Sequence, residues 1–203
     1  MNSLARELKG EPAAPELAYT LIFPPGWAQF AVDRDAEARL IQNVRDIYHD
    51  GGRPDIAADV RTRLHVYFAR LRSIKAKAIY LPISRVDDVV LPVSIAAVPY
   101  TAPPGRTIPD SVAAVAKTAV EEITFPFATV YRWQETRDRV EREQGLSSET
   151  ITYLFPLPGE NQRKGFLLSY AVLHPTDEAD AQFTETLIAL FDAIMGTFRW
   201  KQA

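Results

Sequence analysis

The sequence predicts an α+β fold in which an antiparallel β-sheet is flanked by helices. The period of apolar residues changes along the chain between 3.6 and 2, so helical and extended segments come in blocks. The extended segments are mostly adjacent and joined by short turns, which favours antiparallel pairing over alternating parallel units. A chain of 203 residues is a usual size for one domain. We expect this domain to span residues 18–203, after a flexible N-terminal tail at 1–17.

Two short extended segments are expected at the start of the domain. Residues 19–23 and 27–32 are rich in aromatic and aliphatic side chains, and a Pro-Pro-Gly turn sequence at 24–26 separates them. Turn residues between two such segments are typical of a β-hairpin. We therefore expect the two segments to pair with each other.

A pair of helices follows, and we expect it to form an N-terminal helical hairpin. Asp33 can cap the first helix, which should run to about His49 because two glycines follow shortly after it. The second helix should begin near Pro54 and continue to about Ala78, since apolar residues recur there at helical spacing. These residues are Ile56, Val60, Leu64, Tyr67, Leu71, Ile74 and Ala78.

The middle of the chain returns to a period of 2. Residues 79–83 and 89–98 predict two strands, and Leu91, Val93, Ile95 and Ala97 would share one face of the second. Pro92 lies inside this second run. Because proline cannot donate to a sheet ladder, it favours an edge strand or a bulge.

One more helix is expected before the last group of strands. Thr107 and Asp110 have the spacing of a capping box, in which each side chain satisfies a backbone amide of the first turn. Apolar residues at helical spacing continue from there to Ile123. Pro126 should then end the helix.

The last third of the chain predicts an antiparallel meander followed by a helix. Apolar residues alternate in 127–133, 151–157 and 166–172, and a Pro-Gly turn joins the last two segments. Thr176 or Asp177 can cap the final helix. Its apolar side is formed by Phe183, Leu187, Leu190, Phe191 and Ile194.

Composition narrows the range of functions. The chain has no cysteine, which excludes disulfides, thiolate metal sites and a cysteine nucleophile, and fits a reducing cytoplasm. The net charge of −3 predicts no general attraction to nucleic acid or anionic membranes. We expect no signal peptide at the N-terminus, which lacks an apolar run. No phosphate-binding loop, nucleophile elbow, dinucleotide fingerprint or zinc-protease motif occurs, so no catalytic, cofactor-binding or metal-binding residue is assigned.

The remaining polar groups favour local structural roles. No two histidines are four residues apart, the spacing that brings two imidazoles to one metal on a helix. His174 and Asp177 could form a base and its orienting carboxylate, but capping is the commoner role of such a pair. Asp87 and Asp88 could bind a hard cation, yet adjacent acids are also ordinary turn residues.

The most distinctive charged stretch is residues 61–77, which holds six cations and no acid. On a continuous helix these cations would flank the apolar stripe on both sides. Such a helix can bind an anionic partner. More commonly it packs on a core, and its long cationic side chains extend along the margins of the apolar stripe. The cations are Arg61, Arg63, Arg70, Arg72, Lys75 and Lys77.

Two aromatic residues form a second candidate surface. Tyr131 and Trp133 lie on one face of a predicted strand. Facing outward they would bind a partner, since exposed aromatic residues are enriched at interfaces. Facing inward they would be core, and this orientation is favoured because the alternate positions from Ala128 to Arg132 are less apolar.

Three segments together resemble a known group of proteins. They are 23–27 (Phe-Pro-Pro-Gly-Trp), 153–159, and 190–200 at the end of the chain. The set is similar to small uncharacterised actinobacterial proteins, some of them associated with type VII secretion loci, and in layout to the PsbP/Mog1 fold. The resemblance implies that fold for residues 18–200. It also implies an accessory or binding role, as in photosystem assembly and small-GTPase regulation, and no catalytic residue.

These observations lead to one functional hypothesis and two alternatives. The first is a non-catalytic, cytoplasmic protein-binding or accessory protein, whose partner is another protein such as a secretion component. The first alternative is a small-ligand-binding protein or enzyme with a pocket between sheet and helices. The second is a protein that binds anionic surfaces through the basic stretch 61–77. No cofactor is expected, and homo-oligomerisation remains open.

Overall fold

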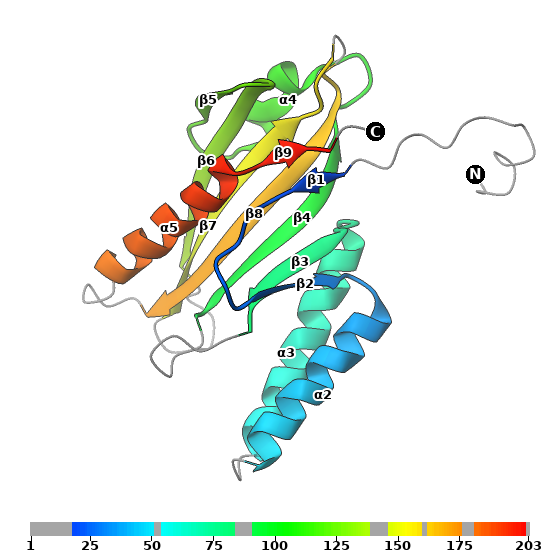
Figure 1. Ribbon diagram of the computed structural model, residues 1–203, viewed down its shortest axis with the longest axis vertical. Coiled ribbons are helices and arrows are strands. Elements are labelled where there is room, and N and C mark those ends of the chain that lie inside the picture. The colour runs from blue at the N-terminus through cyan, green and yellow to red at the C-terminus, as the bar shows by residue number, and fades with distance from the viewer. Residues whose placement is uncertain are drawn as a thin grey trace, which may run out of the picture.

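The computed structural model describes residues 18–50, 54–83, 91–138, 146–159, 162–175 and 181–201. The fold is α+β, with one large antiparallel sheet and, within the described residues, four helices (Figure 1). The helices are α2 (Arg34–Asp50), α3 (Pro54–Ser73), α4 (Ile108–Val115) and α5 (Ala181–Gly196). The strands are β1 (Tyr19–Thr20), β2 (Trp27–Ala31), β3 (Ala78–Pro82), β4 (Val93–Thr101), β5 (Glu121–Phe125), β6 (Ala128–Asp138), β7 (Leu146–Pro156), β8 (Lys164–Pro175) and β9 (Arg199–Trp200).

The main sheet has seven strands in the order β2-β3-β4-β8-β7-β6-β5, and each neighbouring pair is antiparallel. The predicted meander is confirmed, because β6, β7 and β8 are sequential neighbours. A separate two-stranded ladder joins β1 to β9, near the two ends of the described chain (Figure 1). The predicted tail at 1–17 lies outside the described residues.

The predicted opening hairpin is wrong. Tyr19 pairs with Trp200 and Trp27 pairs with Pro82, so β1 and β2 each have a distant partner. The prolines between the two strands have no amide hydrogen to donate to a ladder. Phe23 stacks on Tyr80 at a centroid distance of 4.7 Å, which holds the connection against the face of the sheet. The turn residues therefore carry the chain across the sheet and do not fold it back on itself.

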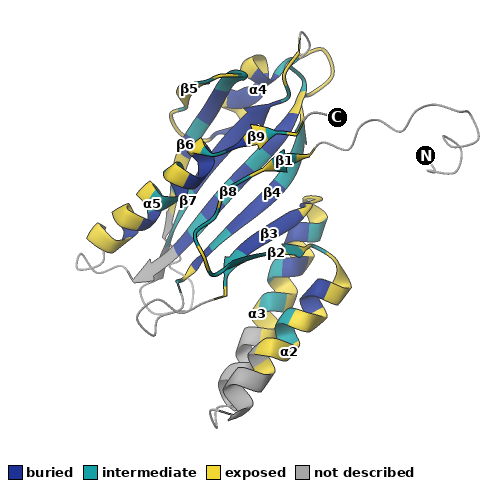
Figure 2. Ribbon diagram, in the orientation of Figure 1, coloured by how far each residue is buried: buried dark blue, intermediate teal, exposed yellow. Residues whose placement is uncertain are grey.

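Both faces of the sheet are covered. On the first face, α5 and the β1–β9 ladder pack over the largest apolar cluster, which includes Phe155 and Phe198. On the opposite face, α4 covers one end and the α2–α3 pair covers the other. Figure 2 shows the strands largely buried and the outer surfaces of the helices exposed. The sheet is thus the middle layer of the structure.

The starts of α2, α3 and α4 follow the prediction, but two helix ends do not. Asp33 caps α2, accepting a hydrogen bond from the Ala36 amide at 2.7 Å, and the capping box at the start of α4 is present. The apolar residues from α4 to Ile123 were expected to be helical, but residues 121–125 form β5 and pair with β6. The error arises because Ile123 fits both periods, and its strand pairing is set by β6, which follows it in the chain.

Helix α3 also ends earlier than predicted, at Ser73. Lys75 adopts a left-handed φ of 59°, and the Ala76 amide bonds back to the Leu71 carbonyl at 2.9 Å, which closes the helix. As a result Ile74 is 47% exposed and Ala78 belongs to β3. The last part of the predicted apolar stripe is therefore not helical.

Two smaller predictions also need correction. Pro92 precedes β4, so it does not mark an edge, and β4 lies between β3 and β8 within the sheet. Val93, Ile95 and Ala97 do share one buried face. In α5 the residues from Leu187 to Ile194 pack as predicted, but Phe183 is 43% exposed. The predicted caps Thr176 and Asp177 lie outside the described residues.

Gly165 is the position at which glycine is most clearly required. A Cβ atom there would lie 2.3 Å from the Phe155 carbonyl oxygen and 3.2 Å from Ile108 Cδ1 of α4. We expect Gly165→Ala to lower the free energy of unfolding by about 2 kcal/mol, because the strands or α4 must shift. Urea denaturation measures this. Gly196→Ala is the control, since a Cβ there meets nothing within 4 Å and should be neutral or slightly stabilising.

Candidate functional site

A buried carboxylate joins the two helices of the α2–α3 pair. Glu37 in α2 is 6% exposed, and its Oε1 lies 2.7 Å from His65 Nδ1 of α3. Arg72 Nη1 donates a hydrogen bond to Oε2 of the same carboxylate. Burial raises the pKa of Glu37, but the hydrogen bonds and charges of Arg72 and His65 outweigh it and leave the pKa below its ordinary value. This contact sets which side of α3 faces α2.

The side of α3 opposite its buried residues carries exposed residues, which we call the outer face. At 100° per residue, this face lies away from the buried side chains of Phe68 and Leu71. Val66 is near its centre and is 63% exposed. The outer face consists of Thr62, Arg63, Val66, Ala69, Arg70 and Ser73, all exposed. Figure 1 shows the α2–α3 pair extending beyond the sheet.

The six cations predicted as one group are divided by the structure. Arg63 and Arg70 lie on the outer face, whereas Arg72 turns toward α2 and binds Glu37. Arg61 is exposed on the same side of α3 as Arg72, by helical position. The remaining two, Lys75 and Lys77, follow the end of the helix and are exposed there. The prediction of one basic helix over 61–77 is therefore wrong beyond Ser73.

The second predicted surface is buried. Tyr131 is 3% exposed and Trp133 is 4% exposed, and both pack beneath α4 with Ile108 and Leu154. The inward orientation favoured by the sequence is correct, and the assignment of these two residues to partner binding is wrong. The aromatic residues are covered because α4 packs on this face of the sheet.

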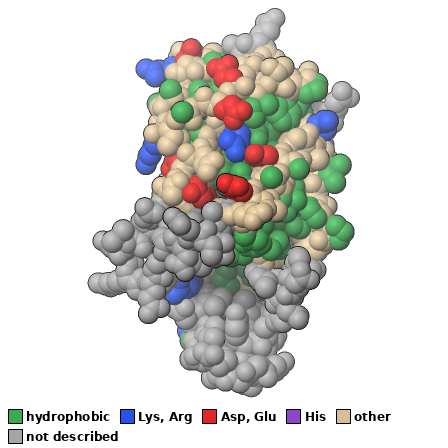
Figure 3. All heavy atoms as spheres, turned by 90° about the vertical axis from the view of Figure 1, so that its left-hand side faces the viewer, with side chains coloured by type: hydrophobic (Ala, Val, Ile, Leu, Met, Phe, Trp, Pro, Cys, Tyr) green, Lys and Arg blue, Asp and Glu red, His purple; other side chains and the backbone are tan. Residues whose placement is uncertain are grey.

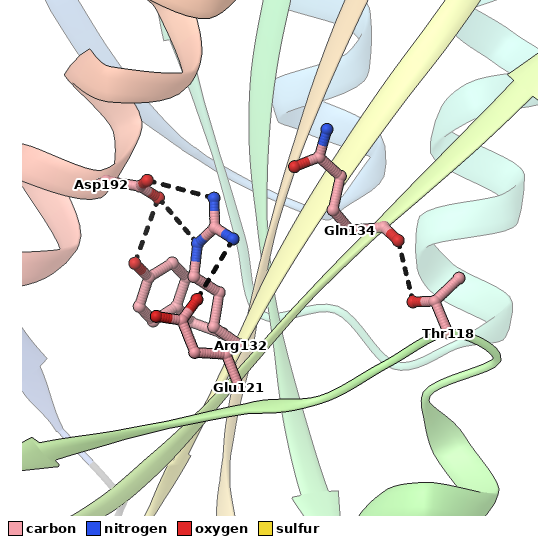
Figure 4. Close-up of polar contacts among 6 residues, drawn as sticks. Thr118, Glu121, Arg132, Gln134 and Asp192 are labelled. Carbon is pink, nitrogen blue, oxygen red and sulfur yellow. Dashed lines mark hydrogen bonds and ion pairs between the residues drawn. The ribbon is translucent and has the colours of Figure 1, made fainter.

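A polar cluster on the other side of β6 was not predicted. Figure 4 shows Arg132 facing Asp192 of α5, which accepts from Arg132 Nε at 3.2 Å and from Nη2 at 3.1 Å. The Tyr153 hydroxyl donates to the same carboxylate at 3.1 Å, and Glu121 lies 3.6 Å from Arg132 Nη1. In the sequence Arg132 alternates with Tyr131 and Trp133, so it belongs to the strand face that was expected to point outward. The cluster joins α5 to the sheet, and its donors and acceptors are engaged with one another.

Charge is unevenly distributed over the surface. Figure 3 views the side of the molecule formed by β5 and α5, where acidic side chains gather. Among the described residues, Glu121 and Glu122 of β5 and Glu185 of α5 are exposed. Among the described residues of the α2–α3 pair, exposed cations outnumber exposed acids. The cations are Arg34, Arg39, Arg45, Arg61, Arg63 and Arg70, and the acids are Asp33 and Asp35 at the start of α2. An acidic partner would therefore be attracted to the outer face of α3, which carries Arg63 and Arg70 and no acid, more than to the β5 side.

Other predicted polar groups are only partly described. His65 bonds to Glu37, while the side chains of His49 and His174 and the whole of Asp87 and Asp88 lie outside the described residues. In the described part of the chain, no three or more His, Asp or Glu side chains are grouped as metal ligands. None of the described helices combines the length and the hydropathy that crossing a membrane requires. No protein-family model matches the chain, and no curated protein is significantly similar to it.

Proposed function

We propose that this chain is a non-catalytic accessory protein that binds another protein through the outer face of α3. The observation that carries the proposal is the exposed apolar side chain of Val66, flanked by Arg63 and Arg70, on a helix pair that projects from the sheet. Among the described residues, this is a place where exposed apolar and like-charged side chains share one helix face. Such a face provides both contact area and electrostatic preference.

The spacing of the outer face favours a helical partner. Thr62, Val66, Ala69 and Ser73 follow one another at intervals of four, three and four residues, which places them in one row along α3. Their side chains are small, so a second helix can approach closely and pack against Val66. Because arginines border the row, the partner segment should carry Asp or Glu at the matching margin.

The broader assignment rests on the resemblance stated above. A PsbP/Mog1-like architecture, with the α2–α3 pair as a helical hairpin added to it, fits an accessory protein whose contacts are made by helices at the margin of a sheet. We propose a cytoplasmic location, which suits the cysteine-free sequence, and a protein partner such as a component of a secretion system.

Charge reversal on the outer face tests the proposal. The tagged full chain and its variant Arg63→Glu with Arg70→Glu are used for affinity capture from the native host, with bound proteins identified by mass spectrometry. Arg106→Glu with Lys117→Glu is the matched control, because it makes the same change in charge at exposed positions near α4. We expect wild type and control to capture a stoichiometric partner. The outer-face variant should capture about tenfold less of that partner, or still less.

Val66→Asp separates apolar contact from charge. It should reduce capture of the same partner while leaving all arginines in place. Since Arg63 also has an interaction within the chain, thermal unfolding of each variant checks that the fold is retained. The proposal is contradicted if the outer-face variants capture the same partner as the wild type. Binding to anionic vesicles or RNA, lost on the same charge reversal, would instead favour an anionic-surface function.

A further inference from the structure

A cavity of about 340 Å³ lies where the chain crosses from β1 to β2 over the edge of the main sheet. Since one water molecule occupies about 30 Å³ of liquid, the cavity could hold roughly ten waters. Its size is at the lower end of the range for small-molecule sites. The lining includes Tyr19, Phe23, Trp27, Gln29, Tyr80 and Lys201.

The aromatic part of the lining, which we call the aromatic wall, is held in place by ring contacts. Phe23 stacks against Trp27 at a centroid distance of 5.4 Å and against Tyr80 at 4.7 Å. Tyr19 stacks on Phe198, a residue of the main core, at 5.3 Å. These contacts orient the rings before any ligand arrives, so stacking on them requires little ordering of side chains.

Two tyrosine hydroxyls leave one hydrogen without an acceptor. The Tyr19 and Tyr80 oxygens are 2.9 Å apart, and one hydroxyl donates to the other. Each hydroxyl carries one hydrogen, so the accepting tyrosine still has its own to donate. Burial raises the pKa of both residues, which keeps both hydroxyls protonated at neutral pH. Within the described residues neither hydroxyl has another hydrogen-bond partner, so an oxygen in the cavity could accept this hydrogen.

The charge at the cavity favours an anion. Lys201 is the charged residue among the described residues that line it, and its backbone amide bonds to the Ala18 carbonyl at 3.0 Å. This backbone bond fixes the start of the lysine side chain beside β1. The lining includes no carboxylate within the described part of the chain. A negative group in the cavity would therefore be attracted by Lys201 and would meet no opposing charge from the described lining.

We propose that this cavity is a binding site for a small aromatic carboxylate. The ring of the ligand packs on the aromatic wall, and the carboxylate accepts from the free tyrosine hydrogen and from the Lys201 ammonium group. Gln29 supplies a further amide at the edge. A neutral aromatic molecule would retain the stacking but lose the charge-assisted bonds, so the site should prefer the acid.

Calorimetric titration of the full chain with three acids tests the proposal: benzoate, 2-naphthoate and indole-3-acetate. At least one should bind the wild type. Lys201→Met removes a cation and should weaken binding of that acid by about fivefold. Gln29→Glu adds an anion and should weaken it by a similar factor or more. Both positions are exposed, so the fold should be retained. Lys117→Met, at an exposed position near α4, should have no effect.

A neutral analogue completes the experiment. 2-Naphthalenemethanol should bind more weakly than 2-naphthoate to the wild type and equally to wild type and Lys201→Met. The proposal is overturned if none of the three acids binds at millimolar concentration, or if the acid that binds has the same dissociation constant in wild type, Lys201→Met and Gln29→Glu. Arg70→Glu on α3 should leave acid binding unchanged, which keeps this site separate from the proposed protein-binding face.

Discussion

Replacing Phe198 by alanine should lower the free energy of unfolding by about 4 kcal/mol, the largest single effect that we expect. Phe198 is fully buried, and its ring lies parallel to that of Phe155 at a centroid distance of 3.9 Å. It also contacts the rings of Tyr19, Phe127 and Trp200. Phe198 therefore fills the space between the sheet, the end of α5 and the β1–β9 ladder, and alanine would leave a cavity there.

Urea denaturation followed by circular dichroism measures this effect. Phe183→Ala, in α5, is the matched control. Phe183 is 43% exposed, so its truncation should change the free energy of unfolding by less than about 0.5 kcal/mol. Phe198→Leu should fall between the two. A loss below about 1 kcal/mol for Phe198→Ala would show that the ring does not occupy the core position described here.

The second large effect is expected at Glu37. Glu37→Ala should lower the free energy of unfolding by about 3 kcal/mol, because it removes the buried acceptor of Arg72 and His65. Arg72 keeps 31% of its side chain exposed, so water partly replaces the lost partner and the loss should not exceed this value. Urea denaturation gives the overall change. Hydrogen exchange in α2 should show faster exchange at residues 36–42, where the two helices separate first.

Arg39→Ala provides the control on the same helix. Arg39 is exposed, and its truncation should leave stability within about 0.5 kcal/mol of the wild type. If Glu37→Ala and Arg39→Ala have equal effects, Glu37 does not join α2 to α3.

The contribution of Glu37 should also depend on pH in a defined direction. Its pKa in the folded chain is below the ordinary value of 4.5, so the unfolded state takes up a proton first as the pH falls. The stability that Glu37 provides is therefore fully present above pH 4.5 and is lost as the pH falls through the folded pKa. The difference in unfolding free energy between wild type and Glu37→Gln should shrink as the pH falls below 4.5. A difference that grows on acidification would contradict this.

Local signals in the sequence predicted the starts of α2, α3 and α4 and the meander. Asp33 and the Thr107–Asp110 capping box act within one turn, so their roles can be read from adjacent residues. The strands of the meander pair with their neighbours in the chain. In each case the partners that determine the structure are close in the sequence.

Distant partners explain the errors. Nothing near residue 19 indicates that its partner strand is at residue 200, and residues 121–125 become a strand because β6 pairs with them. The same holds for the candidate sites. The acid that binds Arg72 comes from a different helix, and Arg132 meets Asp192 across the layer between the sheet and α5. The stretch 61–77 has no acid of its own, but in the structure an acid from α2 binds one of its arginines.

Packing of neighbouring elements determines which aromatic and apolar side chains are exposed. Tyr131 and Trp133 had the composition of an interface, and the sequence correctly favoured their burial, but it did not indicate that α4 covers them. Val66 is an apolar residue outside the predicted apolar stripe of α3, and it is exposed. The outer face of α3 emerged only when the positions of α2 and the sheet around α3 were known.

Site-specific crosslinking tests the proposed binding face most directly. A photo-crosslinking amino acid is placed at Val66 in the full chain, produced in the native host, and at Ala113 of α4 as an exposed control position. We expect one protein to be crosslinked from position 66 and not from position 113, with a contact peptide that is acidic and helical. Equal crosslinking from both positions, or from position 113 alone, would contradict a binding function of the outer face of α3.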